Sequence, residues 1–366
     1  MPTHNPENER LKRAYFAYLK EARRLGEHSI DAAAAALNHF ETYTKNRPFK
    51  SFHIQQAMAF KRKLAEELNQ RTGEPLSKST ILTTLHALRA FFQWLSLQPG
   101  YRSRLSYADA EYFNLSAKDT RIAKVVTDKW VPTIPQILNV IRAMPSAGEI
   151  DRRNRALIAF TLLTGARDGA IVSLKLKHVH VEEGKLVQDA REVKTKFSKS
   201  FTTWFFPVAE EVLQIVVQWI EFLTNEKLFG PDDPLFPATR IVVGPDHRFQ
   251  RAGLTRSHWT TATPVRAIFK DAFAGAGLPY ANPHVFRATL VQLGQQLCRT
   301  PEEFKAWSQN LGHESMITTF SSYGRVSQVR QAEILRQMGQ ADDPIKRTKD
   351  VIDEMRLFLQ RVGKSA

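Results

Sequence analysis

Apolar residues in the first third of the chain recur at helical spacing, and turn residues separate the repeats. The segment SIDAAAAALNHFETYT is rich in alanine, the strongest helix former, and Ser29 is expected to cap it. The segment FHIQQAMAFKRKLAEELNQ carries a second apolar stripe and ends at the turn signal RTGEP. This stripe consists of Ile54, Met58, Phe60, Leu64 and Leu68.

A third helix is expected in STILTTLHALRAFFQWLSL, which opens near Ser79 and stops before Pro99. Its apolar stripe consists of Leu85, Leu88, Phe92 and Leu95. Such a stripe is most simply a core face and not a ligand site. The first part of the chain is therefore expected to form a helical domain.

The stretch SAKDTRIAKVVTDKWVPTIP is polar and basic, and Pro132 and Pro135 at its end favour the start of a new helix. We therefore expect a helical domain over 1–118, a linker over 119–130, a second domain over 131–340 and a tail over 341–366. The tail has an apolar stripe at Ile345, Ile352, Met355, Leu359 and Val362. An amphipathic helix there packs either on its own domain or on a neighbouring copy of the chain.

The second domain begins and ends with helical patterns but changes to alternation in between. The segments HVHVEEGKLV, DAREVKT and SFTTWFFPV predict three strands, with turns near Gly184 and Ser198. Helices are expected in RNRALIAFTLLTGAR, AEEVLQIVVQWIEFLTN, TPVRAIFKDAFAGAG, PHVFRATLVQLGQQL and EEFKAWSQNLG. The fold class is therefore mainly α with a small antiparallel β-sheet.

Composition narrows the class of protein. With 43% hydrophobic and 24% charged residues, the chain has the composition of a soluble globular protein. No stretch approaches the roughly 18 apolar residues of a membrane helix, and the N-terminus lacks the apolar core of a signal peptide. The single cysteine, Cys298, cannot form an internal disulfide, which predicts a cytoplasmic location. The net charge of +15 favours nucleic acid as partner, although membranes and acidic proteins also attract basic chains.

Four segments of the second domain carry residues suited to chemistry. They are TGAR with Arg167, PHVFRATL with His284 and Arg287, LGHES with His313, and TTFSSYGRV with Tyr323. The lysine-rich turn KTKFSKS lies between the first two. Each segment alone is weak evidence for a functional site. Such histidines and arginines are usually surface groups or turn caps, and a tyrosine is usually half-buried.

The order of these residues is more specific than any one of them. The chain carries, in this order, an Arg, a hairpin Lys, His-x-x-Arg, Leu-Gly-His and a Tyr about ten residues further on. This order resembles the signature of the tyrosine recombinase (phage integrase) family. The resemblance covers nearly the whole chain, and WVPTIPQILNVI and DPLFPATR also match. It implies a SAM-like core-binding domain followed by a catalytic domain, which together form a C-shaped clamp on DNA.

The resemblance also implies a reaction. Arg167 and Arg287 would hold the non-bridging oxygens of a phosphodiester and stabilise the charge of its transition state. Tyr323 would attack the phosphorus and form a covalent 3′-phosphotyrosyl link. Lys196 would protonate the leaving 5′-oxygen, His284 would act as general acid/base or orient the phosphate, and His313 would donate a hydrogen bond to it.

Neither ATP nor a metal or other cofactor is expected, because the phosphotyrosine conserves the bond energy and arginines neutralise the charge. The sequence contains no phosphate-binding Gly-x-x-x-x-Gly-Lys loop and no clear carboxylate cluster for magnesium. His178 and His180 alternate with valines on an expected strand, so they are expected at the surface and not as metal ligands.

The lysine turn resembles the family's common Thr-Lys-x-x-Lys-Ser turn but leaves the choice of lysine open, and the sequence departs from the family pattern near both arginines. Thr-Lys-x-x-Lys-Ser favours Lys196 as the acid, whereas the count back from Pro207 favours Lys199, and Lys194 is also available. Ala170 replaces an acidic residue that the family often has, and Ala288 replaces a histidine.

The resemblance implies double-stranded DNA with a specific site as the partner and a homotetramer that assembles on two paired sites. Directionality factors are possible further partners, and the expected location is the nucleoid. Basic residues that lie off the apolar stripes or in the lysine turn are expected to contact DNA phosphates. The alternative is that they are solvated surface charges. They are Lys61, Arg62, Lys63, Lys78, Lys194 and Lys199.

The leading hypothesis is a site-specific recombinase of a mobile element. A non-catalytic DNA-binding regulator on the same scaffold and a type IB topoisomerase-like enzyme are the alternatives. The complete set of arginines, histidines and tyrosine disfavours the regulator, and the compact helical N-terminal domain disfavours the topoisomerase.

Overall fold

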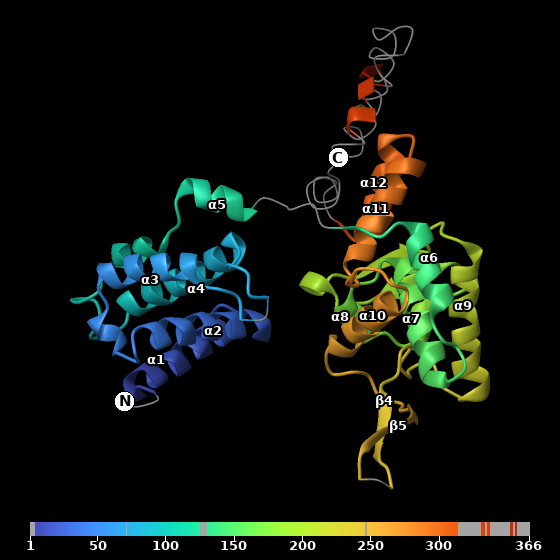
Figure 1. Ribbon diagram of the computed structural model, residues 1–366, viewed down its shortest axis with the longest axis horizontal. Coiled ribbons are helices and arrows are strands. Elements are labelled where there is room, and N and C mark those ends of the chain that lie inside the picture. The colour runs from blue at the N-terminus through green and yellow to red at the C-terminus, as the bar shows by residue number, and fades with distance from the viewer. Residues whose placement is uncertain are drawn as a thin grey trace. The chain divides into compact units, whose positions relative to one another are not determined.

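The computed structural model describes residues 4–70, 72–124, 130–245 and 247–313, together with 331–333, 335–336, 352–353 and 356. The chain divides into two compact units, Met1–Thr127 and Asp128–Ala366. Helices dominate both, and two small antiparallel sheets lie in the second, so the expected fold class is confirmed (Figure 1). Tyr323 and most of the expected tail helix lie outside the described residues.

The named elements of the first unit are all helical. They are α1 (Pro6–Ala17), a π-helical turn (Tyr18–Ala22), α2 (Glu27–Tyr43), a 3₁₀ turn (Phe49–Ser51), α3 (Ile54–Glu66), α4 (Lys78–Ser96), a 3₁₀ helix (Tyr107–Phe113) and α5 (Ala117–Lys124) (Figure 1). No helix within the described ranges is both long and apolar enough to cross a membrane.

Aromatic rings form the centre of the first unit. The ring centroids of Phe52 and Phe92 lie 4.2 Å apart, and those of Phe92 and Phe113 lie 5.3 Å apart. The apolar stripe expected on α4 is confirmed, because its four members are completely buried. Packing of these rings, and not local helix propensity, supplies most of the stability of such a domain.

Two local predictions in the first unit are wrong. Helix α2 begins two residues before Ser29, with Gly26 as its N-cap, and the amide of Ser29 donates to the Gly26 carbonyl. On α3, Met58 is 38% exposed and Leu68, beyond the end of the helix, is 55% exposed. Phe60 and Leu64 of the expected stripe are buried, and Ala57 completes the buried face of α3.

The segment expected to be a linker contains helix α5. This helix contacts α4, and Lys78 forms an ion pair of 3.0 Å with Asp119. The side chain of Ser116 accepts a hydrogen bond from the amide of Asp119 in the first turn of the helix. Residues 119–124 of the expected linker thus belong to the first unit.

The second unit arranges helices around a central one. The helices are α6 (Ile134–Ala143), α7 (Glu149–Thr164), α8 (Asp168–Ile171), α9 (Glu210–Glu221), α10 (Thr263–Gly275), α11 (Val285–Leu297) and α12 (Pro301–Asn310) (Figure 1). Shorter turns are the 3₁₀ segments Leu176–His178 and Lys196–Ser198 and the π-helical turn Phe222–Glu226. Helix α7 contacts α6, α9 and α11, and its last nine residues are all buried.

Two antiparallel sheets complete the second unit. The first has the order β1 (Val179–His180), β2 (Lys185–Gln188) and β3 (Phe201–Trp204). The second is a hairpin of β4 (Thr239–Val243) and β5 (Phe249–Leu254), which projects from the body of the unit (Figure 1). This hairpin was not predicted from the sequence. The turn expected near Gly184 is confirmed, and Gly184 has a positive φ of 65°.

The prediction of a strand in DAREVKT is wrong. The β2–β3 ladder ends at the pair Gln188 and Phe201, and residues 189–200 form a loop, called here the lysine loop. The carboxylate of Asp189 accepts a hydrogen bond from the amide of Arg191, which bends the chain away from β3. Short polar side chains that bond to a nearby backbone amide compete with a ladder in this way.

Candidate active site

Arg167 follows a sharp turn at the end of the central helix. Helix α7 ends at Thr164, and Gly165 adopts the left-handed conformation with φ of 60°. A β-carbon at Gly165 would lie 3.0 Å from side-chain carbons of both Leu290 and Leu311. The close approach explains why glycine stands here, and it directs the chain into α8, of which Arg167 is the N-cap.

Arg287 joins the three segments that the motifs had singled out. It lies in the first turn of α11, next to the N-cap His284, and is 2% exposed. Its Nη1 donates to the carbonyl of Gly165 at 2.8 Å, and its Nη2 donates to the carbonyl of Leu311. The same Nη2 lies 2.8 Å from Nε2 of His313. The TGAR turn, the His-x-x-Arg helix and the Leu-Gly-His turn therefore meet at one guanidinium.

His313 follows α12 after a turn at Gly312, whose φ is 69°. The backbone amide of His313 donates to the carbonyl of Ser308, and the side chain is only 7% exposed. Arginine carries only donors, so Nε2 of His313 accepts from Arg287 and the ring proton is assigned to Nδ1. The one N–H donor of the neutral ring therefore lies at Nδ1.

Both histidines are held neutral at physiological pH. Desolvation, and then the positive charges of Arg287 and Arg167, lower the pKa of His313 to about 4. The same causes in the same order lower the pKa of His284 to about 4, although His284 is exposed and so retains part of its contact with water. These shared causes indicate that the residues lie in one electrostatic environment.

The lysine loop brings a further cation to this environment. Lys196 begins the 3₁₀ turn Lys196–Ser198, and its charge lowers the pKa of both His284 and His313. The charge of Lys194 acts instead on His258, whose pKa is lowered mainly by burial. These electrostatic effects favour Lys196 over Lys194 as the lysine of the site, while Lys199 stays an alternative.

The resulting site combines three cationic groups with two neutral imidazoles. Such a combination suits a phosphate, because guanidinium and ammonium groups neutralise charge that grows on its oxygens. A neutral imidazole can donate one hydrogen bond and accept another without adding charge to the site. Among the residues that the structure describes, no group of three or more His, Cys, Asp or Glu side chains could hold a metal ion.

Three of the residues expected to contact DNA have intramolecular contacts in the first unit. Nζ of Lys61 donates to the carbonyl of Asn114 at 2.9 Å, and burial lowers the pKa of this lysine. Nζ of Lys63 lies 5.4 Å from the ring centroid of Tyr43, and Lys78 is paired with Asp119. Arg62 is exposed. Their contacts with phosphates stay a prediction.

Sequence reasoning missed several supporting residues. Asp168 accepts a hydrogen bond of 2.7 Å from Nε of Arg266, and its charge raises the pKa of His284 against the larger lowering effects. Ser173 bonds to the lysine loop through its hydroxyl. The spacing of the motifs contains no signal for such contacts between distant parts of the chain.

The expectation of a surface position for His178 is wrong, because it is buried and its Nδ1 accepts from the amide of Lys175.

Comparison with known proteins assigns the family. Residues 132–330 match the phage integrase family, and residues 13–98 match the phage integrase N-terminal SAM-like domain. The first match spans more than half of the chain. The chain therefore belongs to the phage integrase family, the tyrosine-type site-specific DNA recombinases.

Curated relatives include two tyrosine recombinases. The chain is 26% identical over 255 residues to tyrosine recombinase XerC of Lactobacillus leichmannii, covering 68% of this chain and 72% of that protein. It is 26% identical over 260 residues to tyrosine recombinase XerD of Haemophilus influenzae, covering 70% and 76%.

Solved structures share the fold. A lambda integrase (75–356) dimer bound to a COC′ core site has a TM-score of 0.59 at 15% identity, covering 87% of this chain and 96% of that chain. XerH recombinase bound to a palindromic difH substrate in a post-cleavage complex has a TM-score of 0.60 at 19% identity, covering 88% and 84%.

Proposed function

We propose that this protein cleaves and rejoins DNA at a specific site through a covalent link between Tyr323 and the 3′-phosphate of the cut strand. The observation that carries the proposal is the contact of Arg287 with Gly165, Leu311 and His313. It joins motifs that are far apart in the sequence around one cation, as a phosphoryl-transfer site requires.

In this proposal each residue has a distinct role. Arg167 and Arg287 stabilise the developing charge on the phosphate, and the Nδ1–H of His313 donates to a non-bridging oxygen. Tyr323 forms the bond to phosphorus, and Lys196 protonates the 5′-oxygen that leaves. His284 is suited to proton transfer or orientation, since its depressed pKa leaves it neutral at pH 7.

The partner in this proposal is duplex DNA, bound by both units. The net charge of +15 favours it through counterion release. The solved relatives named above are bound to a core site and to a difH substrate, which supports the same partner class. The proposal also includes a tetramer on two paired sites and a cytoplasmic, nucleoid-associated location. In it, the protein recombines the DNA of a mobile element.

The test uses a nicked suicide duplex. Its sequence comes from DNA crosslinked to the full-length protein in cells and then sequenced. The nick lets the short 5′-hydroxyl strand diffuse away after cleavage, so a covalent adduct accumulates. Wild type is expected to form the adduct without ATP or divalent metal, and Tyr323→Phe is expected to form none.

The other outcomes separate the alternatives. Adduct from both proteins would reassign the nucleophile, and adduct from neither would favour a DNA-binding regulator. Adduct together with relaxation of plasmids that lack the site, and without strand exchange between two duplexes that carry it, would favour a topoisomerase.

A further inference from the structure

The lysine loop needs contacts outside its own hairpin to hold Lys196 in place. Ladder pairing stops at Gln188 and Phe201, and one hydrogen bond from the amide of Ala190 to Oγ of Ser200, 2.9 Å long, closes the base. The side chain of Lys196 is exposed. A loop of this length is commonly mobile unless side chains tie it to a rigid element.

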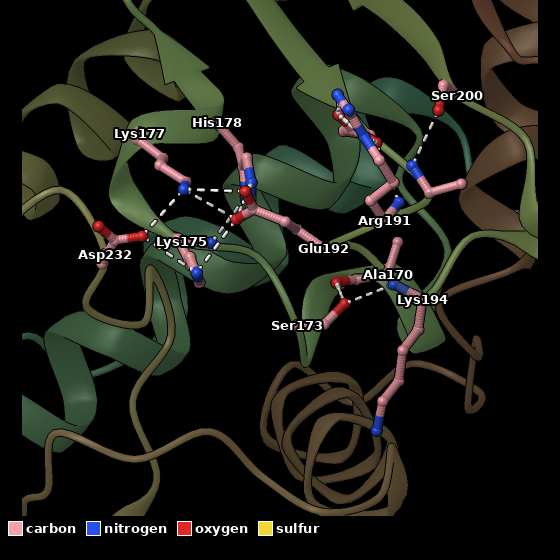
Figure 2. Close-up of polar contacts among 12 residues, drawn as sticks. Ala170, Ser173, Lys175, Lys177, His178, Arg191, Glu192, Lys194, Ser200 and Asp232 are labelled. Atoms are coloured by element: carbon pink, nitrogen blue, oxygen red, sulfur yellow. Dashed lines mark hydrogen bonds and ion pairs between the residues drawn. The ribbon is translucent and has the colours of Figure 1, made fainter.

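Ser173 ties this loop to the segment that follows Arg167. Its hydroxyl oxygen accepts a hydrogen bond of 2.8 Å from the backbone amide of Lys194 and donates one of 2.9 Å to the carbonyl of Ala170 (Figure 2). Ser173 is 8% exposed, so water competes little for these bonds. The amides of Ala170 and Ile171 in turn bond to the carbonyl of Arg167.

The backbone on both sides of Lys194 also rests against this segment. Val193 is 2% exposed and belongs to the core of the second unit. A β-carbon at Gly169 would lie 3.7 Å from the carbonyl oxygen of Lys194, which is ordinary van der Waals contact. The loop therefore follows α8 closely just before it reaches Lys196.

Glu192 provides a second attachment. Its carboxylate lies 3.0 Å from Nζ of both Lys175 and Lys177, and Asp232 bridges the same two lysines from outside the loop (Figure 2). Hydrogen bonds from Lys177 and Lys175 lower the pKa of Glu192. The network is partly exposed, so salt screens it and we expect it to contribute less than Ser173.

We infer that Ser173 and Glu192 are positioning residues for Lys196, which hold its ammonium group at the leaving 5′-oxygen. The inference rests on the proposed function. In the step concerned, the Tyr323 hydroxyl gives its proton to water and its oxygen bonds to phosphorus as the bond from phosphorus to the 5′-oxygen breaks. The 5′-oxygen takes a proton from Nζ of Lys196, which becomes neutral and recovers a proton from water.

The experiment compares two suicide duplexes of the same sequence. One has an ordinary scissile phosphodiester, and in the other a bridging sulfur replaces the 5′-oxygen. A thiolate leaves without a proton, so the sulfur duplex does not need the lysine acid. Adduct formation is followed under single-turnover conditions with the full-length protein.

Lys196→Ala is expected to lose about 10²- to 10⁴-fold in rate on the oxygen duplex and to approach wild type on the sulfur duplex. Ser173→Ala is expected to be about tenfold slower on the oxygen duplex, as the loss of one hydrogen bond implies, and equal to wild type on the sulfur duplex. Glu192→Gln is expected to slow the oxygen duplex about twofold at low salt and not at high salt.

Matched controls separate positioning from stability. Ser96 is 4% exposed, and its hydroxyl donates to the carbonyl of Gln93 in the same manner, but in the first unit. Ser96→Ala is expected to lower the melting temperature about as much as Ser173→Ala and to leave the oxygen rate unchanged. Asp232→Asn removes a charge from the lysine network outside the loop and is expected to leave the rate unchanged.

Two results for Ser173→Ala would overturn the inference: an unchanged rate on the oxygen duplex, or equal slowing on both duplexes. A defect of Lys196→Ala that persists on the sulfur duplex would also overturn it, because Lys196 would then not be the acid. These results differ from failure of the proposed function, in which wild type forms no adduct on either duplex and the inference falls with it.

Discussion

Nη2 of Arg287 and Nε2 of His313 lie 2.8 Å apart in a buried position, so the protonated guanidinium requires a neutral imidazole beside it. A proton on Nε2 would remove the acceptor and bring two positive charges together. The contact thus couples the geometry of the site to the protonation state of His313. It also assigns the ring proton of this histidine to Nδ1.

The stability of the protein should depend on pH because of this histidine. The pKa of His313 is about 4 in the folded protein against an ordinary value of 6.5. Between these values the unfolded chain binds a proton that the folded chain does not. The histidine's contribution, up to about 3 kcal/mol, is complete above pH 6.5 and is lost as pH falls towards 4.

Urea unfolding at intervals between pH 7 and about 4.5 measures this effect, above the range in which most carboxylates titrate. His313→Gln is expected to make the dependence of the unfolding free energy on pH shallower, while the part that comes from His284 remains. An equal slope in wild type and variant would mean that His313 titrates normally.

Arg287→Lys is expected to destabilise the second unit by about 3 kcal/mol, although it preserves the charge. A lysine ammonium cannot reproduce the planar set of donors that reaches Gly165, Leu311 and His313. Chemical denaturation checks the prediction. The control is Arg266→Lys, at an exposed pair with Asp168, for which a loss below about 1 kcal/mol is expected. Similar losses in both variants would argue against the bridging role of Arg287.

Gly165→Ala is expected to cost about 2 kcal/mol or more, because its φ is 60° and the new methyl group meets Leu290 and Leu311 at 3.0 Å. Gly275→Ala is the matched control. Gly275 ends α10, and nothing lies within 4 Å of its added β-carbon, so a gain of about 0.5 kcal/mol is expected. Thermal unfolding distinguishes the two, and destabilisation of both would leave the turn at Gly165 without a special role.

Asn8→Ala is expected to destabilise the first unit by about 2 to 4 kcal/mol. The Asn8 amide is completely buried, donates to Glu41 and to the Arg47 carbonyl, and accepts from the Phe49 amide. Its loss leaves the nearly buried carboxylate of Glu41 with fewer donors. Asn38→Ala, at an exposed position of α2, should change stability by less than about 0.5 kcal/mol. Equal effects on the denaturation midpoint would contradict this account.

Alanine substitution at each lysine of the loop tests the choice among Lys194, Lys196 and Lys199. Only Lys196→Ala is expected to reduce adduct formation by about 10²-fold or more on the ordinary suicide duplex. Lys194→Ala and Lys199→Ala should lose affinity for DNA, with a shallower dependence on salt, and keep the cleavage rate of the bound complex. A loss of cleavage confined to Lys199→Ala would transfer the acid role to that residue.

Elements with a strong repeating pattern were predictable. The stripe of Leu85, Leu88, Phe92 and Leu95 marked a helix because burial of one face dictates its spacing. Elements set by single side-chain contacts were not. Nothing in DAREVKT indicates that Asp189 bends the chain into a loop. The β4–β5 hairpin was also missed, although TRIVV and FQRAGL flank the turn signal GPD.

The sequence by itself indicated the class of chemistry, because its ordered set of arginines, histidines, a lysine and a tyrosine resembles the signature of a family that performs phosphoryl transfer. Only the tertiary structure decided which of these groups meet. Arg287 reaches Gly165, 122 positions away in the chain, and its contact with His313 spans 26. Such contacts depend on how helices pack around α7, and local sequence carries no record of that packing, since many apolar patterns bury the same faces.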